Sequence, residues 1–267
     1  MNRITEKFEK LKSIKKRAFI PYITVGFPDL NLTYDIVLKL VESGADIIEL
    51  GVPFSDPLAD GPTIQKSSQK ALESGTNLIK VFELAEKLKN VVNIPLVLMS
   101  YYNPIYRYGI GRFISDLTNC QISGIIIPDL PPEEYGEIKH LADEHDIATI
   151  FLIAPNSTSE RIRLVAKESS GFIYCVSVTG ITGAKNELNK EINLLIRQIR
   201  LITNKPICVG FGISNKKQVM EVSKIADGVI VGSCLINLIF KEESNPSMLN
   251  ILGNYTSDLA IETKVNL

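Results

Sequence analysis

The residues best suited to chemistry lie in one stretch, Asp46 to Gln65, where a short apolar strand runs into a loop rich in proline and glycine. Glu49 alternates with Ile48 and Leu50, and a carboxylate there is costly to bury unless it has a partner or a task. Asp60 lies in the loop, whose prolines and glycines exclude helix and central strand. The two acids could divide the roles of proton donor and acceptor, although Glu49 could also serve a structural ion pair.

Different surroundings predict different pKa values for these two acids. A strand glutamate in an apolar pocket is expected to have a raised pKa and carry a proton, whereas a loop aspartate is expected to stay ionised. Such a pair suits cleavage of a C–C bond by a retro-aldol route, in which a carbon is protonated and a hydroxyl proton is removed. No lysine lies on a predicted central strand, so a Schiff-base aldolase is not expected.

A second set of residues indicates an anion site. Three glycine clusters follow the last three predicted strands: Thr179–Gly183, Gly210–Ser214 and Gly232–Ser233. Glycines let backbone N–H groups approach an anion closely. Ser214 and Ser233 are predicted to stand at helix starts, where the helix dipole favours negative charge. Each cluster alone could serve only a tight turn, but the three together predict a phosphate monoester site.

These residues need a scaffold that brings strand ends together, and short apolar strands do alternate with amphipathic helices. The predicted strands are Ala18–Thr24, Ile47–Leu50, Leu96–Met99, Gly124–Pro128, Ala148–Ile153, Gly171–Ser177, Pro206–Gly210 and Gly228–Val231. The predicted helices are Met1–Lys16, Leu32–Ser43, Thr63–Glu73, Asn77–Asn90, Gly111–Asn119, Pro132–Glu144, Ser157–Ser169, Asn189–Leu201, Ser214–Lys224, Ser233–Phe240 and Met248–Lys264. In the seventh of these, Ser157 or Thr158 is the expected cap, and Glu160 completes a capping-box pattern from Ser157.

This alternation predicts an α/β protein with one domain over residues 1–267. About eight strand–helix units in a chain of this length indicate a (β/α)8 TIM barrel. An extra N-terminal helix and extra short helices after the second and eighth strands are expected. A doubly wound open sheet is the alternative, but Thr24 to Pro28, after the first strand, lacks its glycine fingerprint.

A barrel of this kind forms its active site at the carboxyl ends of its strands. Glu49 and Asp60 belong to the second strand and its loop, Tyr101 follows the third strand, and Tyr174 lies on the sixth. We therefore expect these four side chains to converge on one face. Tyr174 could instead be a core aromatic, and Asp129, after the fourth strand, could serve only to hold a loop.

Composition excludes several other classes of protein. The net charge of −1 argues against an electrostatic nucleic-acid or membrane binder. No apolar run approaches the roughly 18 residues of a membrane span, and the N-terminus lacks the apolar core of a secretory signal. The four cysteines show no CxxC spacing and indicate buried thiols, and no metal site is expected. We expect a cytoplasmic protein, or one of the plastid stroma if the source is a photosynthetic eukaryote.

Several segments resemble the tryptophan synthase alpha chain family, and the resemblance covers nearly the whole chain. The segments are ELGVPFSDPLADGPTIQ (Glu49–Gln65), PYIT (Pro21–Thr24), IPDLP (Ile127–Pro131), SVTGITG (Ser177–Gly183) and GFGIS (Gly210–Ser214). The resemblance implies a (β/α)8 barrel that cleaves indole-3-glycerol phosphate to indole and glyceraldehyde 3-phosphate. It also implies a beta-chain partner in an alpha2beta2 tetramer, which condenses indole with serine and carries pyridoxal phosphate. No cofactor is expected in this chain.

The resemblance also implies a role for each matching residue. Glu49 is similar to the family's general acid–base, Asp60 to the carboxylate that binds the indole N–H, and Tyr174 to a tyrosine supporting the glutamate. The expected substrate- and phosphate-binding residues are Tyr22, Tyr101, Thr182, Gly183, Phe211, Gly212, Gly232 and Ser233. The loops Pro53–Asp60 and Val178–Asn189 are similar to those that close over substrate and signal to the beta chain. Val178 departs from members that have arginine there.

Other functions remain compatible with the sequence. A free-standing indole-3-glycerol-phosphate lyase would keep the same residues without a partner. A non-catalytic regulatory subunit that binds a phosphorylated ligand would have no reason to keep both Glu49 and Asp60. A different phosphosugar isomerase is possible on fold alone, since barrels host many chemistries, but the Glu49–Gln65 segment argues against it.

Overall fold

The structure is a computed structural model that describes residues 1–176, 185–210 and 212–264, with backbone only for residues 185–190. Its strands form one sheet in the order β5-β4-β3-β2-β1-β9-β8-β7-β6, and the pairs are parallel. The strands are β1 (Ala18–Thr24), β2 (Ile48–Gly51), β3 (Leu96–Met99), β4 (Gly124–Ile126), β5 (Ala148–Ile150), β6 (Leu152–Ile153), β7 (Ile173–Val176), β8 (Ile207–Gly210) and β9 (Gly228–Val231).

The two ends of this sheet are halves of one chain segment. β5 pairs with β4, β6 pairs with β7, and only Phe151 separates them. The Phe151 carbonyl accepts the backbone N–H of Tyr174 at 3.1 Å, which continues the pairing across the gap. The predicted strand Ala148–Ile153 is therefore one continuous segment whose first half pairs with β4 and whose second half pairs with β7. Through this segment the sheet closes into the predicted barrel.

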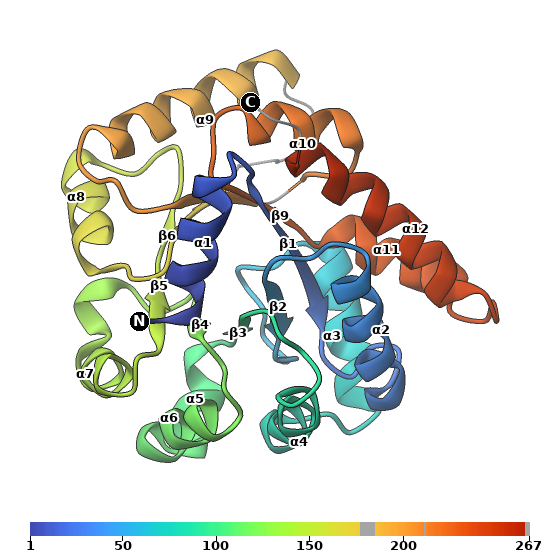
Figure 1. The fold of residues 1–267 in the computed structure, drawn as a ribbon. Coiled ribbons are helices and arrows are strands. Elements are labelled where there is room, and N and C mark those ends of the chain that lie inside the picture. Colours follow the sequence, from blue (N-terminus) through green and yellow to red (C-terminus); the bar gives the residue numbers. More distant parts are fainter. Residues whose placement is uncertain (177–184, 211, 265–267) are drawn as a thin grey trace.

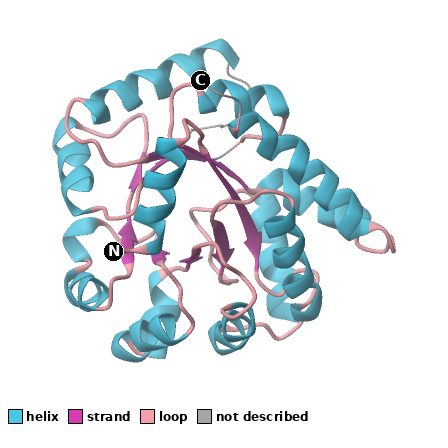
Figure 2. Ribbon diagram, in the orientation of Figure 1, coloured by secondary structure: helices cyan, strands magenta, loops and turns pink. Residues whose placement is uncertain are grey.

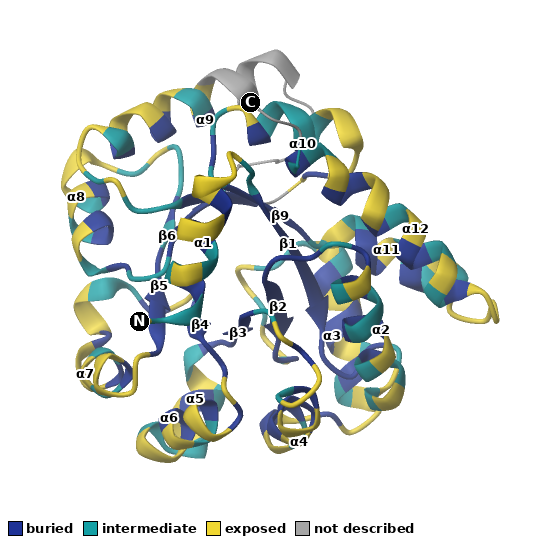
Figure 3. Ribbon diagram, viewed as in Figure 1, coloured by how far each residue is buried: buried dark blue, intermediate teal, exposed yellow. Residues whose placement is uncertain are grey.

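All the helices but the first surround the strands on the outside, as Figure 2 shows. The helices are α1 (Arg3–Ser13), α2 (Leu30–Glu42), α3 (Pro62–Glu73), α4 (Leu78–Leu88), α5 (Tyr102–Tyr108), α6 (Ile110–Asn119), α7 (Gly136–Glu144), α8 (Ser159–Glu168), α9 (Lys185–Arg200), α10 (Lys216–Ser223), α11 (Ser233–Glu242) and α12 (Met248–Ala260). Short 3₁₀ turns cover Pro132–Glu134 and Ile261–Thr263. The strands are buried and the outer helix faces exposed (Figure 3), as a barrel with a closed ring of helices requires.

Three local predictions were wrong. The prediction omitted α5, which begins where the Asp129 carboxylate accepts the Tyr102 N–H at 2.9 Å, a capping contact between distant segments. The predicted helix Pro132–Glu144 is a 3₁₀ turn followed by α7. The cap of α8 is Thr158, whose Oγ1 accepts the Arg161 N–H at 3.2 Å, while Ser157 Oγ accepts the Ala154 N–H, so no capping box runs from Ser157 to Glu160.

Helix α1 lies across one end of the barrel (Figure 1). Its apolar face is Ile4, Phe8 and Leu11, as the sequence predicts, and all three are buried. The Ile4 side chain occupies the space that a Cβ on Gly124 or Gly171 would need, at 2.8 and 3.3 Å. Because Gly124 opens β4 and Gly171 precedes β7, α1 closes the amino ends of the strands and leaves the carboxyl ends for the site.

Candidate active site

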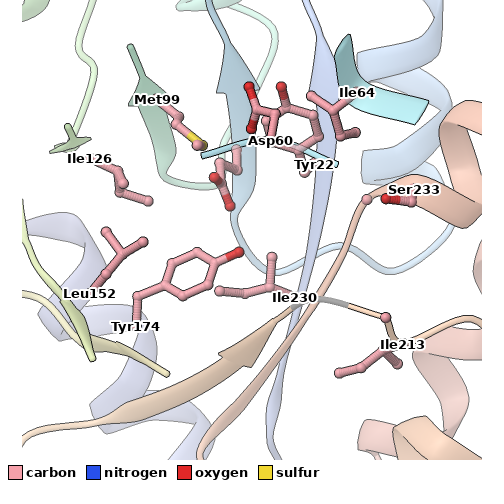
Figure 4. Close-up of a pocket in the computed structure, with 13 residues that line it drawn as sticks. Tyr22, Asp60, Ile64, Met99, Ile126, Leu152, Tyr174, Ile213, Ile230 and Ser233 are labelled. Carbon is pink, nitrogen blue, oxygen red and sulfur yellow. The ribbon is translucent and has the colours of Figure 1, made fainter. Parts of the chain in front are cut away.

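One pocket lies at the carboxyl ends of the strands, with acids, phenols and apolar side chains in its wall. Its empty space is about 540 Å³, open solvent at the mouth included. The described residues that line it are Tyr22, Glu49, Asp60, Ile64, Met99, Ile126, Leu152, Tyr174, Gly212, Ile213, Ile230, Gly232 and Ser233. In Figure 4 Met99, Ile126 and Leu152 stand on one side, with Ser233 opposite.

Glu49 is the most unusual group in the pocket. It is 1% exposed, and within the described residues neither of its carboxyl oxygens has a hydrogen-bond partner. Burial, and to a smaller extent the nearby charge of Asp60, raise the pKa of Glu49 to about 8. Glu49 is therefore mostly protonated at neutral pH, as the sequence predicts. No cation is paired with it among the described residues, which argues against the structural ion pair.

Asp60 stands beside Glu49 but in different surroundings. Burial raises the pKa of Asp60 to about 6, while a hydrogen bond from Tyr101 opposes that rise. The Tyr101 hydroxyl also accepts the Ala59 N–H at 2.9 Å, so Tyr101 holds both the loop and its carboxylate. Asp60 is therefore mostly ionised at pH 7, although its pKa is higher than that of an ordinary loop aspartate. The pKa of Glu49 is therefore higher than that of Asp60, as required if Glu49 donates a proton while Asp60 stays ionised.

Two buried phenols complete this end of the pocket, and each lies against a strand glycine. A Cβ on Gly51 would overlap the Tyr22 hydroxyl, and a Cβ on Gly210 would come within 2.5 Å of the Tyr174 hydroxyl. Burial holds the pKa of both phenols well above the ordinary value, with Glu49 and Asp60 contributing to each rise. Tyr174 belongs to the buried core, and it also points its hydroxyl into the pocket (Figure 4).

The opposite end of the pocket is made mainly of backbone. Gly212 has φ of +70°, a conformation that favours glycine. Gly232 precedes α11 and has no side chain with which to cap it, and Ser233 is exposed at the first turn. The start of α11 therefore offers N–H groups and the positive end of a helix dipole to the pocket.

Ser214 does not share that arrangement, which corrects one expectation. Helix α10 begins at Lys216, two residues later than predicted, and Asn215 caps it by accepting the Gln218 N–H at 3.0 Å. The Ser214 N–H donates to the Gln218 side chain at 2.8 Å. Of the two predicted helix starts, only that of α11 presents an uncapped end.

The structure brings together most of the predicted site residues that it describes. Tyr22, Glu49, Asp60, Tyr174, Gly212, Gly232 and Ser233 line the pocket, and Tyr101 contacts it through Asp60. Thr182, Gly183, Phe211 and Val178 lie outside the described residues. Asp129 supports α5 through the Tyr102 N–H, in keeping with the loop-holding alternative.

Sequence reasoning missed the apolar wall of the pocket. Ile64 comes from α3, while Met99, Ile126, Leu152 and Ile230 come from strands. The four wall residues that come from strands could have been predicted, because they are inward-pointing residues near the carboxyl ends of predicted strands. An apolar wall beside two acids suits a largely apolar ligand that carries a polar atom.

Comparison with known proteins identifies the family. The model of the tryptophan synthase alpha chain family matches residues 8–260. The chain belongs to that family. It is 46% identical over 259 residues to the tryptophan synthase alpha chain of Thermoanaerobacter sp. (strain X514), covering 97% of this chain and 98% of the relative. Identity to the alpha chain of Geotalea daltonii is 48% over 259 residues, with the same coverage.

Solved structures of tryptophan synthases have the same fold. The alpha subunit from Legionella pneumophila has a TM-score of 0.91 at 34% identity, covering 98% of each chain. A tryptophan synthase structure from M. tuberculosis has a TM-score of 0.90 at 33% identity, covering 99% of each chain. The predicted (β/α)8 fold and the predicted family are thereby confirmed.

Proposed function

We propose that this pocket cleaves indole-3-glycerol phosphate to indole and glyceraldehyde 3-phosphate, the lyase reaction of the tryptophan synthase alpha chain family. The observation that carries the proposal is the Glu49 carboxyl, which is buried in the pocket without a hydrogen-bond partner among the described residues. Leaving such a group unpaired costs free energy, so its position is best explained by a proton transfer to and from a ligand.

Glu49 acts first as the acid and then as the base. With a pKa of about 8 it holds a proton at neutral pH and donates it to C3 of the indole ring. The carboxylate left behind is poorly solvated and therefore basic. As the bond between C3 and the glycerol chain breaks, the adjacent hydroxyl becomes an aldehyde and Glu49 accepts its proton, which restores the starting state.

Asp60 stabilises the positive charge that the first step creates. Protonation at C3 makes the ring an indoleninium cation, whose charge is centred on the ring nitrogen. An ionised carboxylate that accepts a hydrogen bond from the ring N–H lowers the energy of this cation. Tyr101 supports that role because its hydrogen bond to Asp60 favours the ionised form.

Tyr174 and the apolar wall orient the reacting groups. The Tyr174 hydroxyl stands near Glu49 and remains protonated, since burial raises its pKa. Met99, Ile126 and Leu152 offer an apolar surface to the indole ring. At the other end, Gly212, Gly232 and Ser233 bind the phosphate. Thr182, Gly183 and Phe211, which lie outside the described residues, complete the proposed phosphate site.

The proposal includes a partner and a setting. A pyridoxal-phosphate-dependent beta chain receives the indole in an alpha2beta2 tetramer, and this chain itself works without a cofactor, as one domain, in the cytoplasm. Support comes from the family, whose solved members are tryptophan synthases, and from the exposed loop beside the site, where Leu58 is 94% exposed. No helix among the described residues is long and apolar enough to cross a membrane.

Indole release from indole-3-glycerol phosphate tests the proposal. The purified chain is assayed alone and with a tryptophan synthase beta chain from a relative. Slow release that rises strongly with the partner is the expected result. Fast release that the partner does not change would identify a free-standing lyase. No release in either condition, from a folded protein that still binds inorganic phosphate, would indicate a regulatory subunit and overturn the proposal.

A further inference from the structure

The phosphate end of the pocket is formed by two segments that follow different strands. One is the loop after β8, which contains Gly212 and Ile213, and the other is the start of α11 after β9. Backbone N–H groups bind a phosphate well only if their relative positions are fixed. What fixes these two segments to each other is therefore part of the binding site, even where it does not contact the ligand.

Tyr255, on α12, contacts both segments behind the pocket. Its hydroxyl lies 2.7 Å from the carbonyl of Ser214, two residues after Gly212. It also stands beside the sulfur of Cys234, the second residue of α11, close enough to act on the pKa of that thiol. The three residues come from three different elements, and each is half-buried or at the surface, which leaves the pocket side to Gly212 and Gly232.

The direction of the hydrogen bond follows from counting protons. The Ser214 carbonyl can only accept, so the single phenol proton of Tyr255 goes to it. The Cys234 sulfur stands beside the same hydroxyl as a second acceptor: burial raises the pKa of this thiol, and the nearby phenol O–H lowers it. The Tyr255 hydroxyl thus faces both segments at once, and its 2.7 Å bond is the one to Ser214.

We propose that Tyr255 is a positioning residue for phosphate, a tie that sets the distance between the loop after β8 and the start of α11. The inference rests on the proposed phosphate site and adds to it a residue outside the pocket wall. Loss of the hydroxyl leaves both segments in place but lets them move apart. The effect falls on phosphate affinity, whereas Glu49 and Asp60, at the far end of the pocket, keep their chemistry.

The variant Tyr255→Phe tests this tie in the full-length chain. We expect KM for indole-3-glycerol phosphate and Ki for inorganic phosphate to rise roughly three- to tenfold, the size of one neutral hydrogen bond, with kcat within about twofold of the parent. Asp258→Asn is the matched control. It removes the exposed ion pair of Lys216 with Asp258, which also joins α10 to α12, without touching Ser214 or Cys234.

Each outcome is decisive. Unchanged Ki for phosphate in Tyr255→Phe, with phosphate still competing in the parent, would overturn the tie and leave the proposed function intact. An equal rise in Asp258→Asn, or a fall in kcat together with Tm, would show general loosening of α12 and also overturn it. If Tyr255→Phe does not fold, Cys234→Ala removes the sulfur that stands beside the Tyr255 hydroxyl, and an unchanged Ki there would sink the proposal. Phosphate that fails to compete in the parent would refute the site itself.

Discussion

The two ends of the pocket are built in opposite ways. The acid end consists of buried side chains, with Glu49, Tyr22 and Tyr174 almost fully enclosed and Asp60 held by Tyr101. The proposed phosphate end consists of exposed backbone, at Gly212 and at the start of α11. A proton donor needs desolvation to shift its pKa, whereas an anion needs only fixed N–H groups and a helix dipole. On the proposed function, chemistry and affinity belong to separate ends, and a change at one end should leave the other working unless it displaces Tyr22, which lies between them.

The largest expected effect breaks the acid end alone. In Glu49→Gln the amide cannot exchange a proton with C3 or with the hydroxyl, so we expect kcat to fall by roughly 10³-fold, while Ki for inorganic phosphate stays within about twofold. Steady-state indole release and phosphate competition measure the two quantities. Turnover close to that of the parent would remove Glu49 from the acid–base role.

The pH dependence of stability provides the control for that variant. The folded chain holds a proton on Glu49 up to about pH 8, whereas the unfolded chain loses it near pH 4.5. The free energy of unfolding of the parent therefore falls as pH rises between these values, and the penalty is complete above pH 8. Glu49→Gln lacks the penalty, so it should be more stable than the parent at pH 9, by an amount on the order of a few kcal/mol. Equal stability at pH 9 would contradict the raised pKa.

The second effect breaks the phosphate end alone. In Gly212→Asp a negative charge faces the phosphate, and we expect Ki for inorganic phosphate to rise roughly 100-fold. Gly212→Asn is the matched control, because asparagine has the same shape and tolerates the φ of +70° but carries no charge. It should weaken binding much less. Similar losses in both variants would attribute the effect to the backbone rather than to charge, and unchanged binding in a folded Gly212→Asp would refute the phosphate assignment.

A smaller effect, on the pH dependence of kcat/KM, distinguishes the roles of Asp60 and Glu49 at the acid end. Activity requires ionised Asp60 and protonated Glu49, so kcat/KM should fall below about pH 6 and above about pH 8. Tyr101→Phe removes the hydrogen bond that lowers the pKa of Asp60, and the acid limb should move to higher pH. We expect a loss of roughly three- to tenfold at pH 6.5 that narrows towards pH 7.5.

The control for Tyr101→Phe is Tyr106→Phe, which removes a hydroxyl from an exposed tyrosine on α5. Its pH profile should match that of the parent. An acid limb that stays in place in Tyr101→Phe would mean that another group sets the pKa of Asp60.

The same contrast explains what the sequence could predict. Glu49 stands out in a run of apolar residues, and the glycine clusters repeat after successive strands, so local patterns identified both ends. Contacts between distant segments left no such pattern. The start of α5 depends on Asp129, about 27 positions away, and the tie at Tyr255 joins three elements. A strand such as Ala148–Ile153 is recognisable, but whether its hydrogen bonds break at Phe151 depends on the neighbours on either side.

The smallest expected effect tests whether the two ends are separate at all. The Tyr22 ring lies between them, with its hydroxyl against Gly51 and its ring atoms 3.2 to 3.5 Å from where a Cβ on Gly232 would stand. Gly232 has φ of −126°, which lies outside the left-handed region, so its backbone conformation does not demand glycine. The methyl group of an alanine there would displace the Tyr22 ring by a few tenths of an ångström. If the ends are independent, Gly232→Ala raises Ki for phosphate by about twofold and leaves the pH profile unchanged. If Tyr22 couples them, both limbs of the profile shift as well, because the phenol stands near Glu49 and Asp60. We expect the coupled result, since a close-packed ring transmits a displacement rather than absorbing it.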